Sequence, residues 1–286
     1  MTVLWAGLAV GSIYALAALS YNVAFIASGI FNFAQAQFIM AGTFVAYVAG
    51  AKLHLGLAWA IIGGAAVCAI LAGLEEVLAI RPLAGKGRSG ELVTTIGVAI
   101  FLDGLAEVLF GTDPRQVPYI QGSAITLLGG NITPDELTLI LIAVLLTVLI
   151  TVLSARTSLG LRGLAAAENR QAAMIRGINV RYLSLGAFAM AGAIAGGLGP
   201  FVGSATFAIY NLGDNLALKA FVALALGGFG SFPGALIGGL AVGVVEAEVG
   251  VYLGSYYQNA MVLALLLAVL LIRPTGLFGR PAERVV

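Results

Sequence analysis

Charged side chains, histidine and cysteine are all scarce in this chain of 286 residues. The 14 Lys and Arg nearly balance 13 Asp and Glu, so a net charge of +1 gives no electrostatic basis for binding nucleic acid. Cys68 is the only cysteine and His54 is the only histidine. A single thiol argues against an internal disulfide, a metal cluster and a Cys–His catalytic pair. We expect His54 to be a solvated residue of a short loop.

The phosphate-binding loop of ATPases is also missing. The pattern Gly-x-x-x-x-Gly-Lys-Ser/Thr does not occur, since Lys86 is followed by Gly87. No nucleophile–His pair accompanies the few carboxylates of the apolar segments. We therefore expect no catalytic residue, no cofactor and no metal, and we predict that the chain is not an enzyme. Residues 3–27 lack a basic n-region, so we expect a retained span there, not a cleaved signal peptide.

Long apolar segments make up most of the chain. Hydrophobic residues account for 60% and charged residues for 9%, with a mean hydropathy of +1.05, whereas about a quarter of a soluble domain is charged. A membrane-spanning helix needs about 20 apolar residues. We predict an all-α, polytopic transmembrane bundle that forms one domain over residues 1–286, with about eight spans and with broken or half helices. The expected spans are 3–27, 33–51, 57–80, 92–110, 137–155, 183–203, 233–249 and 256–272, with 216–226 as a half-helix.

The apolar segment 220–246 is interrupted by glycine, serine and proline. Such residues free backbone groups that lipid cannot satisfy, so a break survives only where protein or a watery cavity surrounds it. Broken helices of this kind are typical of transport paths. We therefore predict that Gly228 and Gly230 line or gate a path, with tight packing against a partner subunit as the alternative. The glycine pairs 63–64, 196–197 and 238–239 are expected to be helix-packing sites.

Polar residues inside apolar segments are further candidates for the path, because unpaired polar groups are costly in hydrocarbon. Asp103 and Glu107 stand four residues apart, on one helix face, and Asp103 lies deeper. Hydrogen bonding between helices is the structural alternative. We expect a local ion pair of Glu75 or Glu76 with Arg81, and surface positions for Glu246 and Glu248. The path candidates are Ser28, Asn32, Gln35, Gln37 and Asp103.

Basic residues predict the orientation in the membrane, since Lys and Arg favour the cytoplasmic side. Loop 111–136 carries only Arg115 among basic residues and is expected outside. Counting spans between this outer loop and the basic clusters named below places the N-terminus outside and the C-terminus in the cytoplasm. The predicted cytoplasmic clusters are Arg81, Lys86 and Arg88; Arg156, Arg162, Arg170, Arg176 and Arg181; and Arg273, Arg280 and Arg284.

The loop 157–181 is long for a connection between two spans. Its alanines favour a helix over 164–176, and Gly177 suits the position that ends a helix. A short exposed helix without a core of its own needs a partner. The alternative is a helix lying on lipid headgroups with its basic residues towards them.

Four motifs follow one another along the chain: GLAVGSIYALAALSYNVAF (7–25) with GIFNFAQAQFIMAGTF (29–44), ENRQAAMIRGINV (168–180), LKAFVALALGGFGSFPGALIGGLAVGVVE (218–246) and RPTGLFGRP (273–281). In this order they resemble the LivH-type permease family of branched-chain amino acid ABC importers. At 34–37 the chain is neutral, where relatives of this family commonly carry a charged residue. The resemblance implies that 168–180 docks on an ATPase, with coupling carried by Glu168, Asn169, Ala172, Arg176 and Gly177.

The same resemblance implies a function and a set of partners. The chain would carry a small polar solute, first of all branched-chain or related amino acids, by alternating access powered by partner ATPases. Its partners would be a homologous second permease subunit, two cytoplasmic ABC ATPases, a periplasmic or lipid-anchored solute-binding protein and membrane lipid, with no nucleic acid. The expected location is the bacterial cytoplasmic (inner) membrane. The alternatives are an ATP-independent channel, a secondary transporter, or an importer of urea, amides or other small organic solutes.

Overall fold

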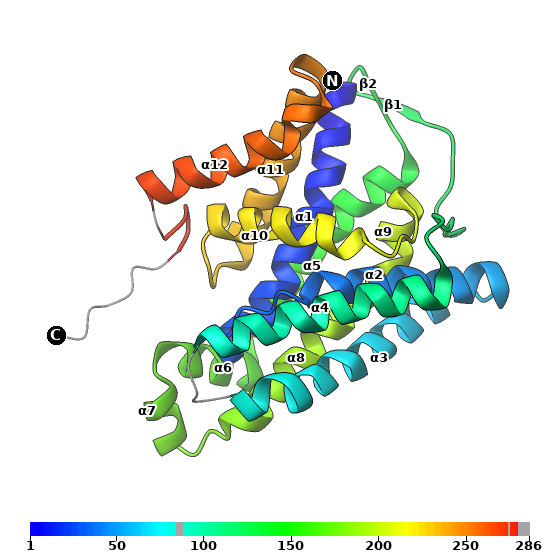
Figure 1. Cartoon of the computed structure of the whole chain (residues 1–286). Helices are drawn as coiled ribbons and strands as arrows, with labels where there is room; N and C mark the ends of the chain where they lie inside the picture. Colours follow the sequence, from blue (N-terminus) through cyan, green and yellow to red (C-terminus); the bar gives the residue numbers. More distant parts are fainter. Residues whose placement is uncertain (84–87, 274, 280–286) are drawn as a thin grey trace. The chain divides into compact units, whose positions relative to one another are not determined.

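A computed structural model of the chain describes residues 1–83, 88–273 and 275–279 (Figure 1). Helices dominate the described residues, and the one two-stranded sheet among them pairs β1 (Ile125–Leu127) with β2 (Gly130–Ile132) in antiparallel register. The α-helices are α1 (Thr2–Ser28), α2 (Gln35–Tyr47), α3 (Leu57–Glu75), α4 (Arg88–Phe110), α5 (Pro134–Arg156), α6 (Ser158–Glu168), α7 (Arg170–Ile175), α8 (Val180–Gly197), α9 (Gly199–Thr206), α10 (Leu212–Gly227), α11 (Phe232–Tyr252) and α12 (Gln258–Ile272). Short helical turns are η1 (Val48–Lys52), η2 (Glu76–Ile80), η3 (Arg81–Leu83) and η4 (Ser255–Tyr257).

Within the described residues, seven helical stretches are long and apolar enough to cross a membrane, against the expected number of about eight. The prediction of an all-α polytopic bundle is thus confirmed. The expected span 33–51 is α2 followed by the π-helical turn η1 and is not among the seven. The seven stretches are Thr2–Ser28, Leu57–Leu83, Gly90–Phe110, Pro134–Arg156, Val180–Gly197, Phe232–Tyr252 and Ser255–Ile272.

Helix α10 corresponds to the half-helix expected at 216–226. It has 16 residues, which at 1.5 Å each is about 24 Å, less than the ~30 Å hydrocarbon core.

Of the basic residues used for orientation, Lys86, Arg280 and Arg284 lie outside the described residues, and so does the side chain of Arg88. The tail motif 273–281 is described only in part for the same reason.

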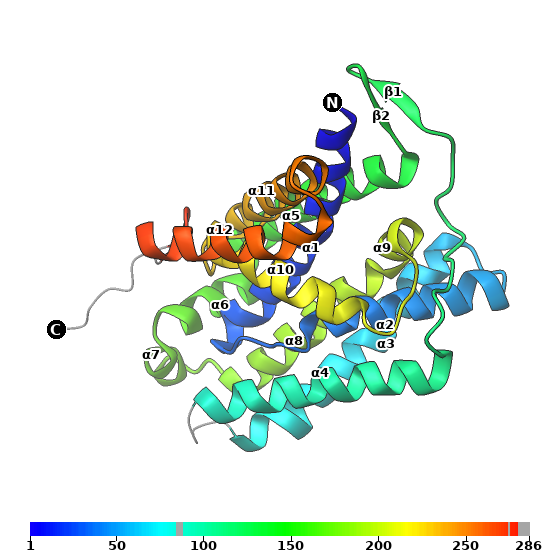
Figure 2. The same cartoon turned by 45° about the horizontal axis from the view of Figure 1, so that its top comes forward.

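The chain forms two compact units. Unit 1 comprises Met1–Asn22, Gly122–Thr151 and Leu218–Val286, and unit 2 comprises Val23–Gln121 and Val152–Ala217. Helices α1, α5 and α10 each contribute residues to both. Unit 2 is built around α2, α3 and α8, which pack on one another with α9 against α2 (Figure 2). Glycine allows this closeness, because a Cβ on Gly196 would collide with the backbone of Gly64 and with Cys68.

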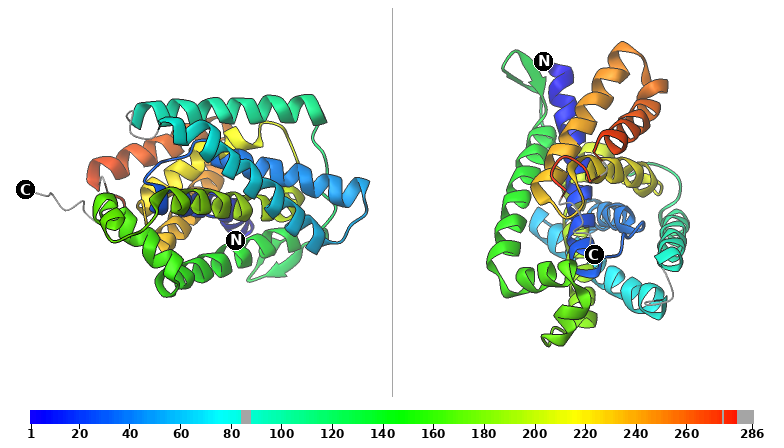
Figure 3. Two further views of the ribbon diagram at one scale, coloured as in Figure 1. Left: turned by 90° about the horizontal axis from the view of Figure 1, so that it is seen from below. Right: turned by 90° about the vertical axis from the view of Figure 1, so that its left-hand side faces the viewer.

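Unit 1 packs α11 closely against α1. A Cβ on Gly239 would collide with Ala15, and one on Gly243 would collide with Gly11. Gly238 faces Ala223 of α10 at a similarly short range. The β1–β2 hairpin lies beside the start of α1 (Figure 3), where the indole Nε1 of Trp5 donates to the Leu127 carbonyl at 3.2 Å. The predicted packing role is confirmed for Gly64, Gly196, Gly238 and Gly239, whereas a Cβ on Gly63 or on Gly197 would make only ordinary contacts at 3.6 Å or more.

The expected interruption of the segment 220–246 is present, and a second break follows α1. Helix α1 ends at Ser28 and is followed by Gly29, which has a positive φ of 71°, before α2 begins at Gln35. Helix α10 ends at Gly227, and Gly228 and Gly230 have φ of 100° and 83°. Such backbone conformations favour glycine because they strain residues that carry a Cβ. We name the two segments break 1 (residues 29–34) and break 2 (residues 228–231).

Candidate functional site

Break 1 is held by hydrogen bonds at the end of α1. The Ser28 hydroxyl donates to the Ala24 carbonyl at 2.7 Å and accepts from the Ile30 N–H at 3.0 Å. The Ser28 carbonyl accepts a hydrogen bond from Nη1 of Arg170 at 2.8 Å. Because Arg170 is the first residue of α7, this contact joins the end of α1 to the loop 157–181.

Asn32 connects break 1 to α3. Its Oδ1 accepts the N–H of Ala34 at 2.9 Å, and its Nδ2 donates to Oε2 of Glu75 at 2.7 Å. Asn32 is 1% exposed and Glu75 is 5% exposed. The expected local ion pair with Arg81 forms with Glu76, at 2.7 Å. Glu75 instead faces break 1, a contact that the sequence pattern did not indicate because its partner is 43 residues away.

Gln37 brings together two carboxyl groups from different helices. Its Nε2 donates to Oδ1 of Asp214 in α10 at 3.1 Å and lies 3.4 Å from Oδ2 of Asp103 in α4. The structure thus places two sequence candidates, Gln37 and Asp103, in one cluster, and it adds Asp214. Glu107, one turn beyond Asp103 on α4, is exposed.

Gln35 is fully buried and lies apart from these contacts. Among the described residues, neither its Oε1 nor its Nε2 has a hydrogen-bond partner. An unpaired amide in a protein interior costs free energy. Gln35 is therefore a buried amide whose hydrogen-bonding groups the described residues leave unsatisfied.

Break 2 is clamped by a residue that sequence reasoning missed, Asn22 of α1. Its Oδ1 accepts the N–H of Gly230 at 2.9 Å, and its Nδ2 donates to the Ser231 carbonyl at 2.9 Å. The side chain of Ser231 caps α11 by accepting the Gly234 N–H at 3.1 Å. A buried Asn within the apolar segment 3–27 was the available signal. The clamp satisfies backbone groups that the helices leave free.

The two candidate glycines of break 2 differ in their surroundings. A Cβ on Gly228 would collide with Gly279 and Phe278 of the tail, which is hydrogen-bonded to the end of α10 through the Phe278 N–H and the Gly227 carbonyl at 3.0 Å. A Cβ on Gly230 would meet nothing within 4 Å. Gly228 is thus required for packing within the chain, and Gly230 only for its backbone conformation.

A buried ion pair connects α10 and α11 in unit 1. Lys219 Nζ contacts Oε1 of Glu246, and the Tyr14 hydroxyl donates to Oε2 of Glu246 at 2.7 Å. Lys219 also lies over the Tyr14 ring, 5.4 Å from its centroid. The expected surface position of Glu246 is therefore wrong: the residue is buried, because Lys219 and Tyr14 replace water as its partners.

The loop 157–181 forms two helices, α6 and α7, instead of the single helix expected over 164–176. Asn169 separates them, because its extended backbone ends α6 and its Oδ1 accepts the Ala172 N–H at 2.9 Å to cap α7. Gly177 ends α7 as predicted, with a φ of 83°. The Ile178 N–H then donates a hydrogen bond to the Ala173 carbonyl at 3.0 Å. Glu168, Asn169, Ala172, Arg176 and Gly177 are all exposed.

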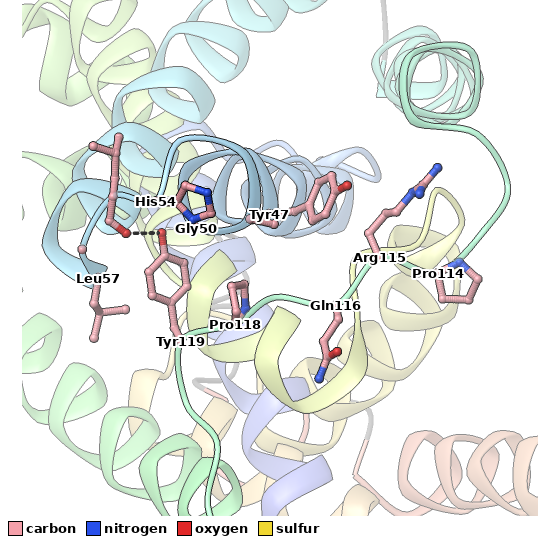
Figure 4. A pocket seen from close by; sticks show the side chains of 12 residues that line it. Tyr47, Gly50, His54, Leu57, Pro114, Arg115, Gln116, Pro118 and Tyr119 are labelled. Atoms are coloured by element: carbon pink, nitrogen blue, oxygen red, sulfur yellow. Dashed lines mark hydrogen bonds between the residues drawn. The ribbon is translucent and has the colours of Figure 1, made fainter.

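Two hollows lie on unit 2. The larger, about 920 Å³, is lined by residues of η1 and of the segments around 54–57 and 114–119, including His54, Arg115 and Tyr119 (Figure 4). There the Tyr119 hydroxyl donates to the Leu55 carbonyl at 3.1 Å, and partial burial raises the pKa of the phenol. The smaller, about 600 Å³, is lined by Glu76, Arg81 and Arg170, among others. His54 is exposed in a loop, as expected.

The family model and the curated relatives are all transport permeases. The family model described as branched-chain amino acid transport system / permease component matches residues 3–272. The high-affinity branched-chain amino acid transport system permease proteins LivH of Salmonella typhimurium and BraD of Pseudomonas aeruginosa are each 31% identical to this chain, with 96% of it and 94% of each relative covered. The ribose import permease protein RbsC of Bacillus subtilis is 28% identical, with 81% of this chain and 79% of the relative covered. Among solved structures, PsaBC from Streptococcus pneumoniae in complex with Fab aligns at 13% identity, over 100% of this chain and 94% of that one, with a TM-score of 0.48, which is too low to support an inference.

Proposed function

Since this chain belongs to the family of permease components of branched-chain amino acid transport systems, we propose that its cargo is a branched-chain or related amino acid. The cargo moves inward by alternating access, and ATP hydrolysis in partner subunits powers the movement. The chain itself is a membrane-spanning transport permease. Its curated relatives are transport permeases and not enzymes, and the nucleotide chemistry belongs to the partners.

The pair of helix breaks is the observation that supports a transport conduit. Each break interrupts an apolar stretch, and each is held by a buried Asn side chain, Asn32 at break 1 and Asn22 at break 2. Irregular backbone at membrane depth is tolerated where it lines a cavity or is surrounded by protein, and broken helices are the usual pointer to a transport path. We assign path-lining roles to Ser28, Asn32, Gln35, Gln37, Asp103 and Gly230, with Gly228 as a packing residue beside the path.

Coupling to the ATPases is assigned to the loop 157–181. Ile175 of α7 is 88% exposed and Met174 is 52% exposed, and an apolar surface of this kind on a short helix suits a groove on a partner. The contact of Arg170 with the Ser28 carbonyl gives α7 a direct link to break 1. A shift of α7 would therefore move the end of α1. The docking residues are Glu168, Asn169, Ala172, Arg176 and Gly177.

The proposed assembly follows from this role. It contains a homologous second permease subunit, two cytoplasmic ABC ATPases and a periplasmic or lipid-anchored solute-binding protein in the bacterial cytoplasmic membrane. The basic residues of the loop 157–181 support a cytoplasmic side for that loop, with the N-terminus outside and the C-terminus inside. An ATP-independent channel or a secondary transporter is the alternative mechanism.

A sugar is the second candidate cargo, because the ribose import permease RbsC is also similar to this chain. The test is uptake of radiolabelled L-leucine by proteoliposomes that contain the chain with its genomically associated ATPases, second permease and binding protein. We expect leucine to accumulate and isoleucine and valine to compete, while excess ribose has no effect. Accumulation of labelled ribose, with no leucine uptake, would replace the amino acid proposal by the sugar alternative.

A further inference from the structure

Gln37, Asp103 and Asp214 form a cluster that three helices of unit 2 bring together, which we call the acidic cluster. The Gln37 side chain is almost fully buried, and its Nε2 reaches both carboxyl groups. An amide nitrogen has two N–H groups, so both are used. Gly213 of α10 lies so close that a Cβ there would come within 2.9 Å of Gln37 Nε2. Backbone packing thus holds the amide against the two carboxyl groups.

The acidic cluster is short of hydrogen-bond donors. Gln37 Oε1 and Asp103 Oδ1 are buried atoms without a hydrogen-bond partner within the described part of the chain. In the same part of the chain, neither Asp103 nor Asp214 has a Lys or Arg partner in an ion pair. Every unsatisfied atom of the cluster is therefore an acceptor. Leaving buried acceptors without donors is unfavourable, and a bound group that supplies donors and positive charge removes this cost.

We propose that the acidic cluster receives the α-ammonium group of the amino acid cargo. This site rests on the proposed function and specifies its substrate class. A primary ammonium group has three N–H donors and no acceptor, so it can donate to the carboxyl groups of both Asp103 and Asp214. Asp214 is exposed and Asp103 is half-buried, so an arriving solute meets Asp214 first, while Asp103 Oδ1 and Gln37 Oε1 are enclosed by protein. A neutral sugar brings hydroxyl groups but no positive charge, so it gains less here than an amine.

The test is the initial rate of radiolabelled L-leucine uptake by proteoliposomes that contain the complete importer. The variants are Asp103→Asn and Asp214→Asn, which keep the side-chain shape and remove the charge. The matched control is Glu107→Gln, which removes a carboxylate one turn away on the exposed side of α4. We expect each Asn variant to lower uptake about tenfold, the size of one lost charge-assisted hydrogen bond, and the control to stay within about twofold.

Assembly is measured in parallel by copurification with the ATPases, and it should be unchanged. Asp214 is exposed, so Asp214→Asn remains informative if Asp103→Asn does not assemble. Uptake at the wild-type rate in an assembled Asn variant overturns the ammonium site and leaves the proposed function intact. Wild-type uptake that requires Na⁺, with Na⁺ dependence lost in the variants, overturns it in favour of an inorganic cation. A wild-type importer that carries no leucine overturns the site together with the proposed function.

Discussion

At the scale of single residues, the contacts of Glu246 show how a charge is kept inside the bundle. Lys219 supplies the opposite charge and Tyr14 supplies a hydroxyl donor. The amide of Gln258 reaches the Glu246 carbonyl at 3.2 Å and ties the start of α12 to α11. The arrangement satisfies Glu246 without water, so its removal should affect stability before it affects transport.

Lys219→Met is expected to lower the midpoint of thermal unfolding of the purified complex. The substitution leaves a buried carboxylate without its cation, which costs about 3–5 kcal/mol in soluble proteins. The double variant Lys219→Met, Glu246→Gln should recover most of the loss, because no unpaired charge remains and Tyr14 keeps an acceptor. The readout is the unfolding midpoint in detergent. Identical midpoints for wild type and Lys219→Met would show that the pair does not stabilise the fold.

The two glycines of break 2 should respond differently to the same substitution. Gly228→Ala places a Cβ against Gly279 and Phe278, so it should reduce the amount of complex that assembles. Gly230→Ala meets open space and strains only the backbone, at a cost of about 1–2 kcal/mol. It should therefore assemble and show reduced leucine uptake. Equal loss of assembly in both variants would mean that break 2 serves packing alone.

At the scale of elements, helices α6 and α7 are proposed to pass a movement from a partner ATPase to break 1. A series of hydrogen bonds runs along break 1. Arg170 of α7 donates to the Ser28 carbonyl, and the Ser28 hydroxyl accepts from the Ile30 N–H. Two residues further on, Asn32 donates to Glu75 of α3. Each contact lies within unit 2. Energetic coupling travels through packed and hydrogen-bonded networks of this kind.

Arg170→Ala is expected to uncouple ATP hydrolysis from transport. Without the guanidinium, α7 loses its hydrogen bond to the end of α1, so leucine uptake should fall about tenfold while ATPase activity stimulated by the loaded binding protein persists. Arg170→Lys should retain part of the uptake, because it keeps one charged donor. Arg162→Ala, in exposed α6, is the matched control and should transport normally. If Arg170→Ala takes up leucine at the wild-type rate with the wild-type ratio of ATP to leucine, this contact does not couple.

The sequence was most informative where local chemistry decides the structure. Gly29, Gly177 and Gly228 mark helix ends, and the short apolar segment before break 2 is a short helix, because glycine and proline act on the backbone beside them. The prediction of a single helix over 164–176 was wrong because Asn169 caps α7 from within the segment. The alanine-rich composition had favoured one uninterrupted helix. Asn22, Glu75, Asp214 and Glu246 were missed or misplaced because their partners lie on other helices, and periodicity within one segment carries no record of such contacts.

At the scale of the whole molecule, α7 can reach cytoplasmic ATPases only if the loop 157–181 faces the cytoplasm. In a background with Cys68→Ala, a cysteine at Ser123 should react with an impermeant thiol reagent in intact cells. A cysteine at Gln171 should react only after the cells are opened. Both residues are exposed in the structure, so in cells that lack the partner ATPases the difference reports the membrane alone. The reverse pattern would invert the topology and remove α7 from the reach of cytoplasmic ATPases.

We expect this permease to move an amino acid only when partner subunits hydrolyse ATP. The most direct test reconstitutes the complete importer in proteoliposomes and follows L-leucine uptake together with phosphate release. Uptake should require both the binding protein and ATP, and a non-hydrolysable ATP analogue should abolish it. Leucine uptake at the same rate without ATP would instead identify the chain as a channel or a secondary transporter.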